Sequence, residues 1–148
     1  MPDFRLAVKG FITENKKVLI LKRSGYTKQM PGIWELPGGR LEAGEDPLAG
    51  LQREIKEETG IEIEIVFPMS VRHFTREDGQ IITMIIFLCK PKSKTVKLSS
   101  EHTEFEWAGI KTARQKMSKF YLKELELFEK NQKSFEKIFG QAGNSFLI

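Results

Sequence analysis

The stretch "GRLEAGEDPLAGLQREIKEETGI", residues 39–61, indicates the local fold more clearly than any other part of this 148-residue chain. Asp46 is a typical N-cap residue, and Pro47 follows at the first helical position, where its missing N–H costs nothing. Gly60 is the residue type that most often ends a helix in the left-handed conformation. The stretch therefore predicts a helix that begins at Pro47 and ends before Gly60.

Apolar and acidic side chains occupy different faces of this expected helix. An apolar stripe, which predicts packing against a sheet, is formed by Leu48, Leu51 and Ile55. At ~100° per residue, the side chains of Glu54, Glu57 and Glu58 fall together at the edge of that stripe. Gly50 lies one turn before Glu54 and would leave a bare patch where a ligand can approach.

This concentration of negative charge contrasts with the net charge of +4. Carboxylates ~5.5 Å apart repel by less than about 1 kcal/mol in water, so a solvated acidic face is one interpretation. The turn at Pro37-Gly38-Gly39 favours another, because it would bring backbone carbonyls close to a ligand. Oxygen donors without His or Cys favour Mg²⁺ or Mn²⁺. We expect a divalent-metal site for a phosphate compound, in which bound cations rather than the chain's own bases balance the acidic charge.

The remaining elements follow from composition and periodicity. Apolar, β-branched runs separated by turn residues predict strands near 5–13, 18–21, 33–36, 62–75, 80–90 and 103–110. Helical spacing over 117–139 predicts one C-terminal helix, with Leu125, Phe128, Phe135 and Ile138 near one face. With no repeat or linker in view, these elements predict a single domain over 1–148, of the α/β or α+β sandwich class.

Several function classes are disfavoured by composition. The longest apolar run, 81–89, is too short to span a bilayer, and the first residues lack a secretory signal pattern. Cys89 is the only cysteine and ends that run, so we interpret it as a core residue in a protein of the reducing cytoplasm. The pI of about 9.2 arises largely from lysines in loop and helix segments, so a nucleic-acid partner is not favoured.

The segment 39–61 resembles the Nudix box, Gly-x5-Glu-x7-Arg-Glu-U-x-Glu-Glu-x-Gly-U, where U is an aliphatic residue. Every defined position is filled, by Gly39, Glu45, Arg53, Glu54, Ile55, Glu57, Glu58, Gly60 and Ile61. A weaker similarity runs from about residue 5 to 110. The resemblance implies an α/β/α sandwich with a mixed sheet. It also implies a hydrolase that cleaves a diphosphate linkage in a nucleotide with water and Mg²⁺ or Mn²⁺.

Residue roles follow from the same resemblance. By position, the metal ligands would be Glu54, Glu57, Glu58 and the carbonyl of Gly38, and Arg53 would orient the glutamates. A carboxylate must also take the proton of the attacking water. Glu54 is one candidate, and family members also use acids outside the box, for which this chain offers Glu101, Glu104 and Glu106.

The substrate is less clearly indicated. "KRSGYTKQMPGIWELPGG" resembles the MutT-type subgroup, which hydrolyses nucleoside triphosphates, including oxidised ones, to a monophosphate and pyrophosphate. That comparison implies that Arg23 contacts the nucleotide and that Trp34 and Glu35 meet the base, although Trp34 is equally suited to the core. The alternatives are ADP-ribose, for which the subgroup's usual proline is replaced here by Arg76 and Glu77, dinucleoside polyphosphates, nucleotide sugars and capped RNA.

Two further questions stay open at the level of sequence. A non-catalytic nucleotide-binding module on the same fold is an alternative, although the complete set of box glutamates favours catalysis. The oligomeric state, monomer or homodimer, is open as well. His73 and His102 lack the spacing of metal ligands, so we interpret them as ordinary strand and loop residues.

Overall fold

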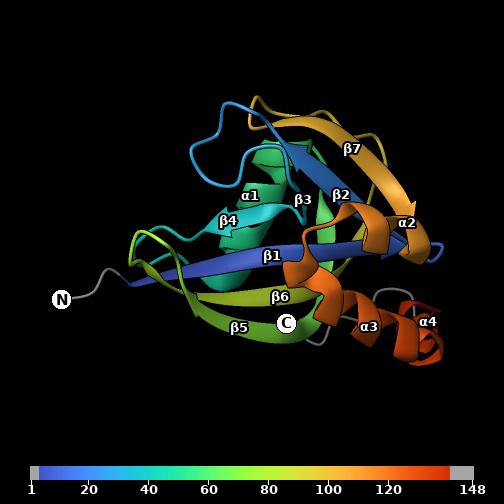
Figure 1. Cartoon of the computed structure of the whole chain (residues 1–148). Helices are drawn as coiled ribbons and strands as arrows, with labels where there is room; N and C mark the ends of the chain where they lie inside the picture. The colour runs from blue at the N-terminus through green and yellow to red at the C-terminus, as the bar shows by residue number, and fades with distance from the viewer. Residues whose placement is uncertain (1–3, 141–148) are drawn as a thin grey trace.

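The computed structural model describes residues 4–140, which form a mixed sheet with helices on both of its faces (Figure 1). The strands are β1 (Phe4–Glu14), β2 (Lys17–Arg23), β3 (Trp34–Glu35), β4 (Gly38–Arg40), β5 (Ile63–Thr75), β6 (Ile81–Pro91) and β7 (His102–Gly109). The helices are α1 (Pro47–Thr59), α2 (Ile110–Lys116), α3 (Leu122–Lys130) and α4 (Gln132–Gly140), with a 3₁₀ turn, η1 (Lys119–Tyr121), before α3. The mixed sheet with helices confirms the predicted α/β class.

β1 is the central strand of the sheet. It runs parallel to β6, from the pair Phe4↔Ile81 to the pair Ile12↔Cys89. It pairs with β2 only next to the turn that joins them, at Thr13 and Glu14. Nearer its N-terminus, at Ala7–Lys9, it pairs with the short strand β4 instead. β2 continues beside β3 and β7 instead. The two strands of the first hairpin therefore diverge, and polar side chains of β1, β2, β3 and β7 meet where they separate.

Two apolar cores lie on opposite faces of the sheet. One is covered by α1, whose Leu51 and Ile55 are fully buried, as the apolar stripe predicted. The other is covered by α2 and α3. Gly10 of β1 allows the close approach of α1, because a Cβ there would lie 2.6 Å from Cδ1 of Ile55. The acidic edge of α1 is thereby held next to β1 and β4.

The ends of α1 agree with the sequence. The side chain of Asp46 accepts a hydrogen bond from the Ala49 amide at 2.9 Å, and Pro47 is the first helical residue. Gly60 has a φ of 74° and donates its N–H to the Lys56 carbonyl. These features confirm the predicted helix.

The prediction of one helix over 117–139 is wrong. Met117 is extended, forms a bridge with Trp34, and is followed by Ser118, whose N–H donates to the Trp34 carbonyl at 3.0 Å. That interaction separates α2 from η1 and α3. Asn131, with φ −112° and ψ 18°, then separates α3 from α4. The side chain of Ile138, also part of the prediction, lies outside the side chains that the structure describes.

A buried ion pair fixes α3 to the sheet. Glu124 is fully buried and accepts hydrogen bonds from Arg72 at 2.9 Å and Ser70 at 2.8 Å, both from β5. The Arg72 guanidinium also lies 4.1 Å from the ring centroid of Phe120.

Cys89 is fully buried, and burial raises the pKa of its thiol, which supports its interpretation as a core residue. Within residues 4–140, no helix is long and apolar enough to cross a bilayer.

Candidate active site

Two glycines let the turn before β4 pass between β1 and the acidic edge of α1. Gly38 has a φ of 135°, and a Cβ on it would lie 2.1 Å from the Val8 carbonyl oxygen. A Cβ on Gly39 would lie 2.8 Å from Oε2 of Glu54. The Gly38 N–H donates to Oε2 of Glu58 at 3.1 Å. Larger residues would therefore displace the turn from these carboxylates. The segment expected only to turn here also forms the strand β4.

Arg53 lies at the centre of a group that we call the Arg53 cluster, with Glu45, Glu54 and Glu57. Its Nε and Nη2 donate to the two oxygens of Glu45, at 2.6 and 2.9 Å. Its Nη1 donates to Glu57 at 3.2 Å, and Nη2 lies 3.2 Å from Glu54. These hydrogen bonds raise the pKa of Arg53 and lower that of Glu45 to about 2. The cluster holds three carboxylates on one guanidinium, as an orienting role for Arg53 requires.

Two box carboxylates are electrostatically unfavourable where they stand. Burial raises the pKa of Glu58 to about 8, although the nearby Lys9 acts in the opposite direction. Burial also raises the pKa of Glu54; Arg53 opposes this effect, while the negative charges of Glu57 and Glu101 add to it. A cation placed beside these carboxylates would relieve both costs.

The expected metal ligands are only partly brought together. Among residues 4–140, no three His, Cys, Asp or Glu side chains are arranged to hold a metal ion. Glu57 is 60% exposed and directed to Arg53, whereas Glu54 and Glu58 lie against the Gly38–Gly39 turn. The chemistry of these groups still fits Mg²⁺ or Mn²⁺, because they are hard oxygen donors with unfavourably buried charge.

Two expectations about this region are corrected. Gly50 does not leave a patch for a ligand, since a Cβ on it would lie 2.3 Å from Cδ2 of Leu41 and 3.0 Å from Glu45. Gly50 instead allows the 41–45 segment to pack on α1. The chain's own bases also balance part of the acidic charge, through Arg53 and through Lys9 near Glu58. The sequence pattern alone could not place Lys9 there.

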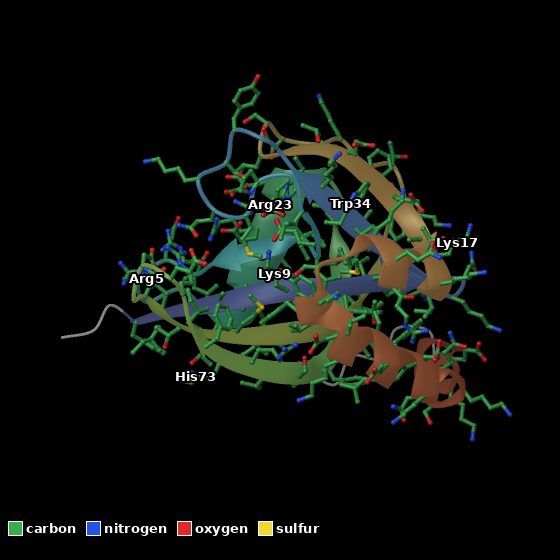
Figure 2. All side chains as sticks on the ribbon, viewed as in Figure 1. Arg5, Lys9, Lys17, Arg23, Trp34 and His73 are labelled. Atoms are coloured by element: carbon green, nitrogen blue, oxygen red, sulfur yellow. The ribbon has the colours of Figure 1, made fainter. Side chains whose placement is uncertain are left out.

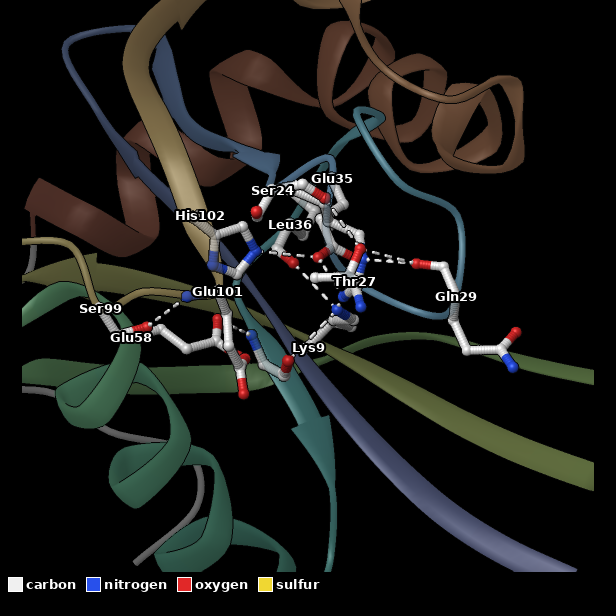
Figure 3. Close-up of polar contacts among 12 residues, drawn as sticks. Lys9, Ser24, Thr27, Gln29, Glu35, Leu36, Glu58, Ser99, Glu101 and His102 are labelled. Carbon is white, nitrogen blue, oxygen red and sulfur yellow. Dashed lines mark hydrogen bonds and ion pairs between the residues drawn. The ribbon is translucent and has the colours of Figure 1, made fainter.

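A second polar group, which we call the Glu35 cluster, lies where β1 and β2 diverge (Figure 3). The carboxylate of Glu35 accepts hydrogen bonds from Lys9 at 3.1 Å and Arg23 at 2.9 Å, and it lies 2.9 Å from Nε2 of His102. Glu35, Lys9 and His102 are buried. Burial alone would raise the pKa of Glu35, but Lys9 and the other two partners outweigh it, so the pKa is lowered. Glu35 is therefore a buried carboxylate ion.

Lys9 connects the Glu35 cluster to the glycine turn. Its Nζ donates to the carbonyls of Leu36 at 3.1 Å and Gly38 at 3.2 Å, in addition to Glu35. Burial acts to lower its pKa, but the ion pair with Glu35 prevails and the pKa is raised. Sequence reasoning missed Lys9, although a lone lysine within the apolar run 6–12 was a signal that a buried partner exists. The interpretation of His102 as an ordinary loop residue is wrong.

The three residues expected to bind substrate differ in exposure: Glu35 is buried, whereas Arg23 and Trp34, both labelled in Figure 2, are partly exposed. Arg23 donates to Glu35 and, through Nε, to the Gln29 carbonyl at 3.0 Å, so it also holds the 24–32 loop. Trp34 is half-buried against the core beneath α2 and α3, and Nζ of Lys116 lies 4.9 Å from its ring centroid. Contact of Glu35 with the base remains a prediction, which is less favourable because Glu35 is buried and already has three partners, Lys9, Arg23 and His102.

The three candidate bases outside the box have different surroundings. Glu104 pairs with Lys22 at 3.1 Å, and Glu106 pairs with Lys116 at 2.6 Å. The negative charge of Glu101 adds to the raised pKa of Glu54, as a smaller cause than burial or Glu57. The Glu101 carbonyl accepts a hydrogen bond from the Ser24 N–H at 2.8 Å, which fixes the backbone there. Because Glu104 and Glu106 are paired with lysines and the charge of Glu101 acts on Glu54, we favour Glu101 among the three.

Comparison with known proteins shows which family the sequence matches. The model of the NUDIX domain matches residues 3–128. A "MutT-like protein" of Streptomyces ambofaciens is 33% identical over 121 residues, which cover 81% of this chain and 73% of that protein. Human "8-oxo-dGDP phosphatase NUDT18" is 35% identical over 91 residues, covering 62% of this chain and 26% of the relative. The chain thus spans about three quarters of the first relative and about a quarter of the second.

Solved structures agree with this comparison. The MutT protein from Methanosarcina mazei Go1 superposes with a TM-score of 0.75 and 25% identity, over 91% of this chain and 97% of the other. The solution structure of the E. coli ORF135 protein gives a TM-score of 0.72 over 97% of this chain, at 22% identity. The second likeness supports the fold.

Proposed function

This chain belongs to the NUDIX family, as a MutT-type hydrolase, and from that premise we propose that it hydrolyses a nucleoside triphosphate to a nucleoside monophosphate and pyrophosphate. The observation that carries the proposal is the position of Glu54. Its carboxylate lies against Gly39, beside Arg53, and near a second carboxylate, Glu101. Such a site offers closely spaced acids for binding cations and for taking a proton from water.

The proposed cofactor is Mg²⁺ or Mn²⁺. Glu54, Glu57, Glu58 and the Gly38 carbonyl would hold it, and when bound it would neutralise diphosphate oxygens and lower the pKa of water. The chain's own contribution is orientation: Arg53 holds Glu54, and the Gly38 N–H holds Glu58. Glu57 would have to turn from Arg53 toward the other ligands.

We assign the proton-accepting role to Glu101, with Glu54 as the alternative. Glu101 is exposed and carries no ion pair among residues 4–140, so its carboxylate is available to water. Glu54 is partly buried and bonded to Arg53, which suits a ligand better than a base. A carboxylate that accepts a proton in the transition state contributes a factor of about 10²–10⁴ to the rate.

The substrate assignment rests on Trp34, Arg23 and the relatives. The exposed part of the Trp34 ring offers a surface for stacking a base, which is worth about 1–3 kcal/mol. Arg23 is 22% exposed and keeps donors for a phosphate or the base. The relative named as an 8-oxo-dGDP phosphatase supports an oxidised purine nucleotide, and it makes the diphosphate the second candidate.

A substrate panel with Mg²⁺ tests this proposal. The panel holds normal and oxidised purine triphosphates and diphosphates, ADP-ribose, a dinucleoside polyphosphate, a nucleotide sugar and a capped RNA. We expect pyrophosphate release from a triphosphate to have the highest kcat/KM. If a diphosphate is cleaved faster, with release of orthophosphate, the diphosphate is the substrate and the proposed metal-dependent hydrolysis stands. If no compound of the panel is hydrolysed, the chain is a nucleotide-binding module.

Trp34→Ala and Glu35→Gln separate stacking from base selection in the same panel. Trp34→Ala should raise KM for all purine nucleotides by a similar factor, about 5- to 150-fold, because stacking tolerates any base. If Glu35 contacts the base, Glu35→Gln should change the ranking of nucleotides. An unchanged ranking with a lower kcat would instead assign Glu35 to support of the site.

A further inference from the structure

The Glu35 cluster links two parts of the candidate active site that are far apart in sequence. At one end, Lys9 donates to the Gly38 carbonyl, and at the other, His102 directly follows Glu101. Figure 3 shows Lys9, Glu35 and His102 in one line of contacts between the glycine turn and the Ser99–Glu101 segment. The chain of contacts is buried along its length.

We propose that His102 is a positioning residue, which fixes the backbone that carries Glu101 through its hydrogen bond to the buried Glu35 carboxylate. This inference rests on the proposed role of Glu101 as the group that accepts the proton of water. It gives Glu35 a supporting function in place of the predicted contact with the base.

The His102 ring has one partner that can fix its orientation. Nε2 lies 2.9 Å from Oε2 of Glu35, whereas Nδ1 is buried without a hydrogen-bond partner in the described part of the chain. The side chain is only 1% exposed, so water does not compete for Nε2. Because Glu35 is an ion held by Lys9 and Arg23, it is a strong and fixed acceptor for the Nε2 proton.

Glu101 itself depends on its backbone for its direction. Within residues 4–140, no side chain forms a hydrogen bond to the Glu101 carboxylate, so no such bond sets the direction of this side chain. Its carbonyl is fixed by the Ser24 N–H at 2.8 Å, and its N–H lies 3.4 Å from Oγ of Ser99. The next residue, His102, begins β7 opposite Arg23. Release of the His102 side chain would thus loosen the backbone on the C-terminal side of Glu101.

A double-mutant cycle tests the proposal on whichever nucleotide the wild-type protein cleaves fastest. His102→Leu removes the bond to Glu35, while His102→Gln keeps an N–H that can reach it. We expect His102→Leu to lower kcat about 10- to 100-fold, the range for residues that orient reacting groups, with KM changed less than about twofold. His102→Gln should stay within about threefold of wild type. In the Glu101→Gln background, His102→Leu should lower kcat by less than about twofold, because the group it positions is gone.

A second measurement and a matched control complete the experiment. The rise in melting temperature caused by Mn²⁺ without nucleotide should be the same in His102→Leu, His102→Gln and wild type, because Glu101 is not one of the proposed metal ligands. His73 is an exposed histidine of β5, bonded to Thr83 and distant from this cluster, so His73→Leu should leave both quantities unchanged. If His102→Leu does not fold, His102→Asn, whose shorter amide cannot reach Glu35, replaces it in the cycle.

Two results would overturn the positioning role. Equal losses of kcat from His102→Leu with and without Glu101 would show that His102 acts elsewhere. A lower melting temperature with unchanged kcat would make it a structural residue. Failure of the proposed function looks different: Glu101→Gln alone would then turn over at the wild-type rate, or the panel would select another substrate class.

Discussion

The two polar clusters of this protein are inverse arrangements of charge. In the Arg53 cluster, one cation is shared by three carboxylates on the exposed edge of α1. In the Glu35 cluster, one carboxylate is shared by two cations and a histidine in the interior. The first has negative charge in excess and is open to further cations. The second has its charge satisfied internally, and its parts come from four strands.

This difference assigns the clusters different tasks. Excess charge at a partly exposed site favours binding of a cation. A buried ion with every partner in place is costly to rearrange, because the removal of one partner leaves an uncompensated charge. We therefore expect substitutions in the Arg53 cluster to change activity more than stability, and substitutions in the Glu35 cluster to change both.

Glu54→Gln should have the largest effect on turnover. The change keeps the shape of the side chain but removes a charge that lies 3.2 Å from Nη2 of Arg53 and against Gly39. We expect kcat to fall about 10²–10⁴-fold, with a melting temperature within a few degrees of wild type. Steady-state kinetics and thermal unfolding of the same preparation check this, and near-wild-type turnover would exclude Glu54 from catalysis.

Lys9→Met should have the largest effect on stability. It leaves Glu35 without its principal counter-ion and the Gly38 carbonyl without its donor. Loss of one partner from a buried ion pair costs about 3–5 kcal/mol. The double variant Lys9→Met/Glu35→Gln, which removes both charges, should recover part of that loss in urea unfolding. Equal stability of the single variant and wild type would show that the cluster is not a structural ion pair.

Glu58→Gln should show the effect of pH. Since burial raises the pKa of Glu58 to about 8 in the folded state, metal-free wild type takes up a proton on folding between pH ~4.5 and ~8. Its stability therefore falls over this range as pH rises, at up to about 1.4 kcal/mol per pH unit. Glu58→Gln lacks this loss, so it should become the more stable protein towards pH 8. Mg²⁺ should reduce the difference in stability between the two proteins near pH 8. Parallel profiles of stability against pH would contradict the raised pKa of Glu58.

Arg53→Ala should have the smallest effect on stability. The ion pairs of Arg53 lie on a partly exposed surface, where such pairs contribute about 0–1 kcal/mol. We nevertheless expect kcat to fall at least about tenfold, because Glu54 loses the group that orients it. Unfolding and kinetic measurements on this variant separate the two roles. A large loss of stability with normal kcat would make Arg53 a structural residue.

The sequence predicts the helical part of the Arg53 cluster but neither its contact with Glu45 nor the Glu35 cluster, for a geometric reason. Arg53, Glu54 and Glu57 lie within one turn of each other on a helix, so their neighbourhood follows from spacing alone. Lys9 and His102 reach the same carboxylate only because β1, β3 and β7 meet where the first hairpin diverges, and no local periodicity records that meeting.

The same reasoning explains which elements were predicted correctly. The ends of α1 are set by Asp46, Pro47 and Gly60, whose preferences are local. The broken C-terminal helix depends on the interaction of Ser118 with Trp34, which is remote in sequence. Helical periodicity also continues through Asn131, because the same core lies beneath α3 and α4. The pattern over 117–139 therefore gives one helix where the structure has η1, α3 and α4.

The parallel pairing of β1 with β6 has a consequence for how the chain folds. β5 and β6 form a hairpin around a short turn, and α1 can form from its own sequence, so both need only local contacts. Residues 4–12 must find residues 81–89, which closes a loop of more than half the chain. Loops of this length are slow to close. The Glu35 cluster does not include β6, but it also needs a distant contact, because His102 and Glu35 are 67 residues apart in sequence. We therefore expect the complete cluster to form after α1 and the β5–β6 hairpin.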